Sequence, residues 1–99
     1  MRTGTNRKTT PAQPTGATLE AEGTTLTAEW GTNGDGSTLN LVLVDQVSGA
    51  VQSGSALDSA ETFEFPAPGV AGHTYVARLT AYRAGEASKV TTTDPETVE

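Results

Sequence analysis

The side chains that could do chemistry in this sequence are few. Its only histidine is His73, and nucleophilic catalysis would need that imidazole beside an acid and a hydroxyl, a role that Asp58 and Ser59 could fill by residue type. A single histidine next to Gly72, in a segment that connects two expected strands, is far more often solvated than catalytic. We therefore expect no catalytic residue and no enzymatic activity.

Metal and cofactor sites are equally poorly supported. Residues 33–37 read Asn-Gly-Asp-Gly-Ser and place oxygen ligands at alternate positions, as a calcium loop does, but the bidentate acid that closes such a loop is absent. The chain has no cysteine, which excludes disulfides, thiolate zinc sites and thiol nucleophiles. Its glycine-rich segments precede no helix that could bind phosphate. We expect an ordinary turn at residues 33–37, no metal and no cofactor.

The charges are divided unevenly along the chain. Residues 1–16 contain Arg2, Arg7 and Lys8 and no acid, whereas the remaining residues contain three basic side chains and all twelve acids. The net charge of the whole chain is −6. An acidic body repels phosphate, so we expect no nucleic-acid binding, and no apolar run is long enough to cross a membrane. The first residues lack the apolar stretch of a secretory signal, which favours either a cytoplasmic product or a piece of a longer secreted protein.

Hydrophobic alternation predicts an all-β chain. Residues 1–16 have the composition of an extended arm or linker, residues 17–95 alternate as strands do, and residues 96–99 are expected to form a tail. The pattern predicts seven short strands, near residues 17–21, 26–30, 38–44, 50–52, 61–65, 74–83 and 88–93. The side chains expected in the core are Trp30, Phe63, Phe65, Tyr75 and Leu79.

Three blocks of sequence resemble the fibronectin type III family. Residues 14–30 are similar to its first two strands and end in Trp30, residues 68–81 are similar to its crossing into the sixth strand and contain Tyr75, and residues 85–93 are similar to its final hairpin. The resemblance implies a seven-stranded antiparallel, immunoglobulin-like β-sandwich in which the Tyr75 hydroxyl bonds the backbone. The last turn has no Arg-Gly-Asp, so integrin binding is not implied.

These observations favour a non-catalytic structural or interaction protein. The interpretation we prefer is a structural or decoration protein of a phage virion, whose arm docks on a capsid or tail protein through Arg2, Arg7 and Lys8 while the sandwich projects. The alternative is an extracellular spacer or binding module from a secreted bacterial enzyme or adhesin. Removing residues 1–16 should leave the sandwich folded, and the threonine-rich last strand could add to a neighbouring sheet.

Overall fold

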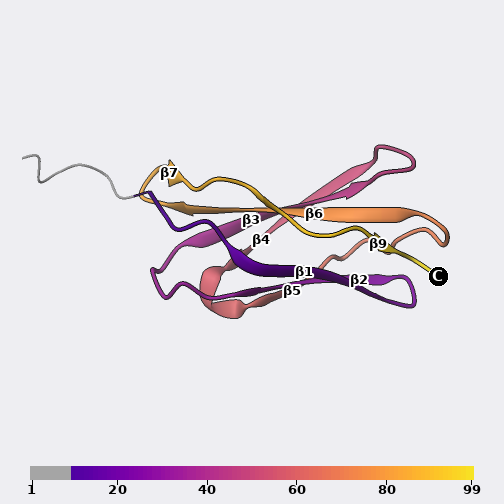
Figure 1. The fold of residues 1–99 in the computed structure, drawn as a ribbon, viewed down its shortest axis with the longest axis horizontal. Helices are drawn as coiled ribbons and strands as arrows, with labels where there is room; N and C mark the ends of the chain where they lie inside the picture. The colour runs from indigo at the N-terminus through magenta and orange to yellow at the C-terminus, as the bar shows by residue number, and fades with distance from the viewer. Residues whose placement is uncertain (1–9) are drawn as a thin grey trace, which may run out of the picture.

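The computed structural model describes residues 10–99 and shows two antiparallel sheets packed face to face (Figure 1). The smaller sheet has the order β1-β2-β5, and the larger has β4-β3-β6-β7, with β8 and β9 also paired to β6. The strands are β1 (Thr15–Glu22), β2 (Thr25–Gly31), β3 (Thr38–Asp45), β4 (Val51–Leu57), β5 (Thr62–Glu64), β6 (Thr74–Arg83), β7 (Glu86–Ala87), β8 (Thr91–Thr92) and β9 (Glu96–Thr97). A single 3₁₀ turn, η1 (Asp58–Ala60), follows β4.

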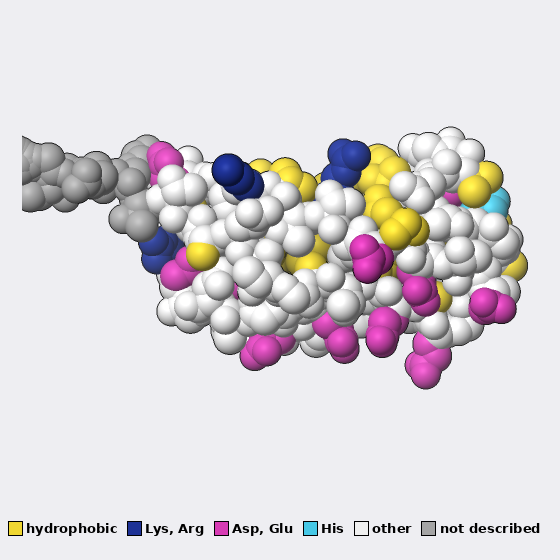
Figure 2. Space-filling model, viewed as in Figure 1, with side chains coloured by type: hydrophobic (Ala, Val, Ile, Leu, Met, Phe, Trp, Pro, Cys, Tyr) yellow, Lys and Arg dark blue, Asp and Glu magenta, His cyan; other side chains and the backbone are white. Residues whose placement is uncertain are grey.

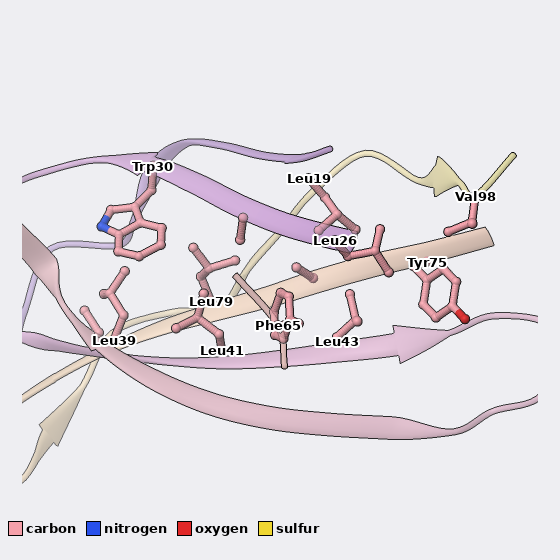
Figure 3. Close-up of a cluster of buried hydrophobic side chains, with 13 residues drawn as sticks. Leu19, Leu26, Trp30, Leu39, Leu41, Leu43, Phe65, Tyr75, Leu79 and Val98 are labelled. Atoms are coloured by element: carbon pink, nitrogen blue, oxygen red, sulfur yellow. The ribbon is translucent and has the colours of Figure 1, made fainter. Parts of the chain in front are cut away.

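The core lies between the sheets and follows the predicted alternation. In β3 and β6 the inward side chains face each other across the ladder, with Leu41 opposite Leu79 and a leucine opposite an alanine on either side. This pairing of large with small side chains fills the inner layer without crowding. Figure 3 shows Trp30 at one end of the cluster and Tyr75 beside Val98 at the other. The fully or nearly fully buried apolar residues of this cluster are Leu19, Leu26, Ala28, Trp30, Leu39, Leu41, Leu43, Phe65, Tyr75, Ala77, Leu79, Ala81 and Val98.

Phe63 differs from the other expected core residues because it is only partly buried. It packs against the edge of the cluster, with its ring 5.1 Å from that of Phe65 in an edge-to-face arrangement. A Cβ added at Gly54 of β4 would lie 2.4 Å from the Phe63 ring, so only glycine fits beneath it. Phe63 thus closes the side of the sandwich where β4 and β5 approach each other.

The described residues contain nine strands, two more than expected, because two short strands replace the one expected at residues 88–93 and a further strand, β9, follows them. The side chains of Ser88 and Thr93 turn inward, and their hydroxyls accept hydrogen bonds from the N–H groups of Ala81 (2.9 Å) and Ala77 (3.0 Å) on β6. A hydroxyl therefore replaces a backbone carbonyl at two places along β6. In place of the expected strand, β7 lies just before residue 88 and β8 lies within residues 88–93.

The expected tail at residues 96–99 is wrong, because these residues complete the larger sheet. Glu96 and Thr97 pair with β6, and Val98 is fully buried. The N–H of Val98 donates to the carbonyl of His73 (2.9 Å), and the carbonyl of Val98 accepts from Gly72 (2.7 Å). The segment reads as polar in sequence because only one of its side chains points inward.

Candidate binding surfaces

The arm is fixed to the sandwich at its base. Arg2, Arg7 and Lys8, the expected partner-binding residues, lie outside the described part of the chain. Pro11 and Pro14 are buried, and the Pro14 carbonyl accepts a hydrogen bond from the Thr91 hydroxyl (2.7 Å). The Gln13 amide donates to the Val90 carbonyl at 2.9 Å. Residues 11–14, expected to belong to a linker, are thus packed on the domain, and β1 begins at Thr15 rather than after residue 16.

Asp58 organises the loop between β2 and β3. It is 1% exposed, and its Oδ2 accepts hydrogen bonds from the N–H groups of Asn33 (2.9 Å) and Gly34 (3.2 Å) and from the Thr32 hydroxyl. Its backbone carbonyl accepts from the indole Nε1 of Trp30 at 2.9 Å. One acid residue therefore ties the loop to the core tryptophan. Sequence reasoning considered Asp58 only as a partner of His73 and missed this role.

The calcium-like segment at residues 33–37 forms a bend in the loop between β2 and β3. Asp35 Oδ1 accepts hydrogen bonds from the N–H of Ser37 (3.0 Å) and from its hydroxyl (2.5 Å). These bonds to Ser37 are the main reason that the pKa of Asp35 lies below its usual range. Across residues 10–99, no group of three or more histidine or acidic side chains is placed to hold a metal ion.

His73 was expected to be a solvated loop residue, but its side chain is instead hydrogen-bonded to a buried acid. Its Nδ1 lies 2.6 Å from Oδ2 of Asp45, the last residue of β3, whose side chain is 5% exposed. Burial tends to raise the pKa of Asp45, but hydrogen bonds from His73 and from the N–H groups of Val47 and Ser48 outweigh it and hold that pKa well below its usual range. Asp45 therefore stays ionised and anchors both the histidine and the β3–β4 turn.

An apolar pocket of about 300 Å³ lies beside this pair, at the end of the sandwich where β3 turns into β4. The aromatic ring of Tyr75 lines it, and the Tyr75 hydroxyl accepts a hydrogen bond from the N–H of Val70 (2.7 Å), the backbone contact that the family resemblance implied. Val51 and Val70 line the pocket and are more than half exposed. An apolar hollow with a few fixed polar groups at its rim has the character of a small binding site.

The outer face of the smaller sheet has a different character, since it carries only threonine and glutamate. Each glutamate is paired across the strands with a threonine, as Glu20 is with Thr27 and Glu29 with Thr18, so no two carboxylates stand directly opposite. Figure 2 shows these acids along the lower side of the domain. A groove of about 670 Å³ runs between the β1 edge and residues 94–96, which add further acids.

Neither surface contains a set of catalytic groups. Within the described residues, His73 is hydrogen-bonded through its side chain to Asp45 alone, and its expected partners Asp58 and Ser59 belong to a different part of the fold, where Asp58 holds the β2–β3 loop. No described segment forms a helix long and apolar enough to cross a bilayer. The buried acids Asp45 and Asp58 fix loops, and the buried hydroxyls of Ser88 and Thr93 bond the backbone of β6.

Solved structures with a similar fold define the class of this domain. No known protein-family model and no curated protein sequence matches the chain. It is similar to the fibronectin type III domain of the human collagen alpha-1(XX) chain, with a TM-score of 0.75 and 18% identity over 96% of this chain and 92% of that domain. The chain has a fibronectin type III-like fold.

Two further structures show the same fold. The twitchin kinase region of C. elegans matches with a TM-score of 0.71 and 15% identity over 91% of this chain, which spans only 17% of the twitchin chain. A structure described as a myokine matches with a TM-score of 0.64 and 10% identity, over 88% of this chain and 99% of that one. At these identities the likeness concerns architecture, and function has to be argued from the surfaces.

Proposed function

We propose that this chain is a non-catalytic interaction module that attaches to a partner protein through its basic N-terminal residues Arg2, Arg7 and Lys8. The observation that supports this proposal is the attachment of residues 11–14 to the sandwich through two buried prolines and the bonds of Gln13 and Pro14. Because the base of the arm is fixed, a partner that binds the arm also holds the sandwich close to itself. The basic residues then meet acidic groups of the partner, while the body presents its own surfaces outward.

The setting we favour is a phage virion, with a capsid or tail protein as the partner. A decoration protein needs one attachment element and one compact body that projects, and this chain combines a basic segment with an acidic sandwich. The acidic face of β1, β2 and β5 repels other acidic surfaces, so attraction to an acidic particle would be confined to the arm.

The alternative, an extracellular spacer or binding module within a longer secreted protein, has an observation of its own. The first described residues lie beside β7 and the last lie beyond β9, at opposite ends of the long axis of the sandwich (Figure 1). A domain with its ends so placed can be joined in series to a neighbour on each side. In that arrangement the basic residues would belong to a linker.

Gene context and particle binding separate the two proposals. The virion proposal expects the gene to lie among phage structural genes, and it expects the chain to sediment with purified particles of that phage. R7Q/K8Q should reduce this cosedimentation, and R78Q/K89Q, which removes two exposed charges from the body, should not. A reading frame that continues into other secreted domains, or equal cosedimentation of both variants, would overturn the virion proposal.

A further inference from the structure

Strand β4 is an edge of the larger sheet that lacks the usual protection against pairing. It pairs with β3 over seven consecutive positions without a register shift, and among the described residues no strand pairs with its other side. Residues 46–57, which include the whole strand, contain no charged side chain. Long, flat and uncharged edges are the ones to which another strand adds most readily.

The other edges of the described fold are each protected. The N–H of Ala21 on β1 is bonded to the Glu96 carboxylate at 3.0 Å, and β1 also has a register shift near its start and carries Glu20 and Glu22. Strand β5 has three residues, and β7, β8 and β9 have two each. Charged side chains, irregularities and short length all disfavour strand addition, and β4 has none of them.

The hydrogen-bond pattern shows which backbone groups β4 leaves free. Just beyond its two ends, the Ala50 carbonyl accepts from Asp45 N–H (2.9 Å), and the Asp58 N–H donates to Ser37 (3.0 Å). Bonding alternates along an antiparallel ladder, so the even-numbered residues of β4 bond β3. The N–H and C=O groups directed toward the free edge are therefore those of Val51, Ser53, Ser55 and Leu57.

We propose that β4 pairs antiparallel with β4 of a second copy of this chain, about a twofold axis at Gly54. The strand sequence Val-Gln-Ser-Gly-Ser-Ala-Leu is nearly symmetric about that glycine. In this register Val51 lies opposite Leu57 of the partner subunit, and Ser53 lies opposite Ser55 of the partner subunit. All four residues are those whose backbone groups face outward, so each pair exchanges two backbone hydrogen bonds. The two sheets become one continuous sheet with a self-complementary interface.

The side chains on the outer face agree with this register. Val51 and Leu57 are 65% and 62% exposed, and the ladder places Val51 in one row with Val44 and Val76. The same ladder places Leu57 in one row with Thr38 and Tyr82. In the dimer, the row that contains Val51 in one copy continues into the row that contains Leu57 of the partner subunit. The exposed side chains of Val51 and of Leu57 of the partner subunit then cover each other. Apolar cross-strand pairs of this kind stabilise sheets.

Sedimentation velocity of the full chain over micromolar to millimolar concentrations tests the proposal. We expect a concentration-dependent dimer that tightens with added salt, because each copy carries a net charge of −6. V51K/L57K places lysine opposite lysine and should weaken the dimer about tenfold. V51K/L57E places lysine opposite glutamate only in this register and should restore it. V90K, at a side chain that is 51% exposed, is the control and should dimerise as the wild type does.

Cysteine crosslinking tests the register directly, since the chain has no native cysteine. In an oxidised mixture of S53C and S55C, we expect a covalent heterodimer in higher yield than the homodimer of either variant alone. A wild-type chain that stays monomeric at millimolar concentration would overturn the proposal. So would a dimer that V51K/L57K leaves unchanged while unfolding temperatures show every variant to be folded.

Discussion

The ring of Phe63 on β5 lies directly over the Cα of Gly54 on β4, so closely that an added Cβ would be 2.4 Å from the ring. This contact joins the two sheets at the side of the sandwich where no strand connects them by hydrogen bonds, since β4 pairs with β3 and β5 with β2. Gly54 is also the residue at which we place the twofold axis of the proposed dimer.

We expect Gly54→Ala to lower the free energy of unfolding by about 1–3 kcal/mol, because the methyl group must displace the Phe63 ring. Urea denaturation measures this loss. G54A/F63L should recover part of it, as the smaller leucine leaves room for the methyl. Equal stability of G54A and the wild type would show that the ring moves away without cost.

We expect Asp58→Ala to destabilise the fold by about 1–3 kcal/mol, because the N–H groups of Asn33 and Gly34 and the Thr32 hydroxyl lose their shared acceptor. Asp94→Ala, which removes an exposed acid, should change stability by less than about 0.5 kcal/mol. Tryptophan fluorescence adds a second measurement, since Trp30 donates to the Asp58 backbone and reports on its position. Identical denaturation curves for both variants would contradict the role given to Asp58.

The Asp45–His73 pair should make stability depend on pH in the acid range. The pKa of Asp45 is lowered in the folded state, so its carboxylate contributes stability above the unfolded pKa of about 3.9 and loses that contribution as the pH falls further. Wild-type protein should therefore be more stable than Asp45→Asn at pH 6, and the difference should shrink progressively below about pH 4. Chemical denaturation of both proteins at a series of pH values from 6 to below about 4 measures this difference in stability. A difference that is constant over the whole range would assign the effect to packing.

Truncation should distinguish the arm from its base. Removing residues 1–9 should leave the melting temperature almost unchanged, whereas removing residues 1–14 should lower it, because Pro11 and Pro14 are buried and Pro14 accepts the bond from Thr91. Removing residues 1–16, which was expected to leave the sandwich folded, also takes away the first two residues of β1. Differential scanning calorimetry of the two truncated chains provides the measurement, and equal melting temperatures would contradict the anchoring of residues 11–14.

Local pattern predicted the strands best where a strand has one buried face. Residues 74–83 alternate through Tyr75 and Leu79, and the structure places both inside and the strand at the predicted bounds. The pattern predicted a strand only near residues 50–52, yet β4 extends to Leu57, since pairing with β3 decides the conformation of residues that have low strand propensity, such as serine and glycine. Residues 88–98 were misjudged because buried hydroxyls of Ser88 and Thr93 look like exposed polar side chains in a sequence.

The sequence by itself determined that this protein is an all-β chain with a basic N-terminal segment, an acidic body and no thiol chemistry. Those properties follow from composition and from a period of two, which neighbouring residues express on their own. Only the tertiary structure decided that His73 meets Asp45, 28 residues away, and that Asp58 supports Trp30, also 28 residues away. It alone decided that β4 is left as an unprotected edge. Strand order and the partners of buried polar groups depend on contacts between distant segments, and a local pattern does not specify these.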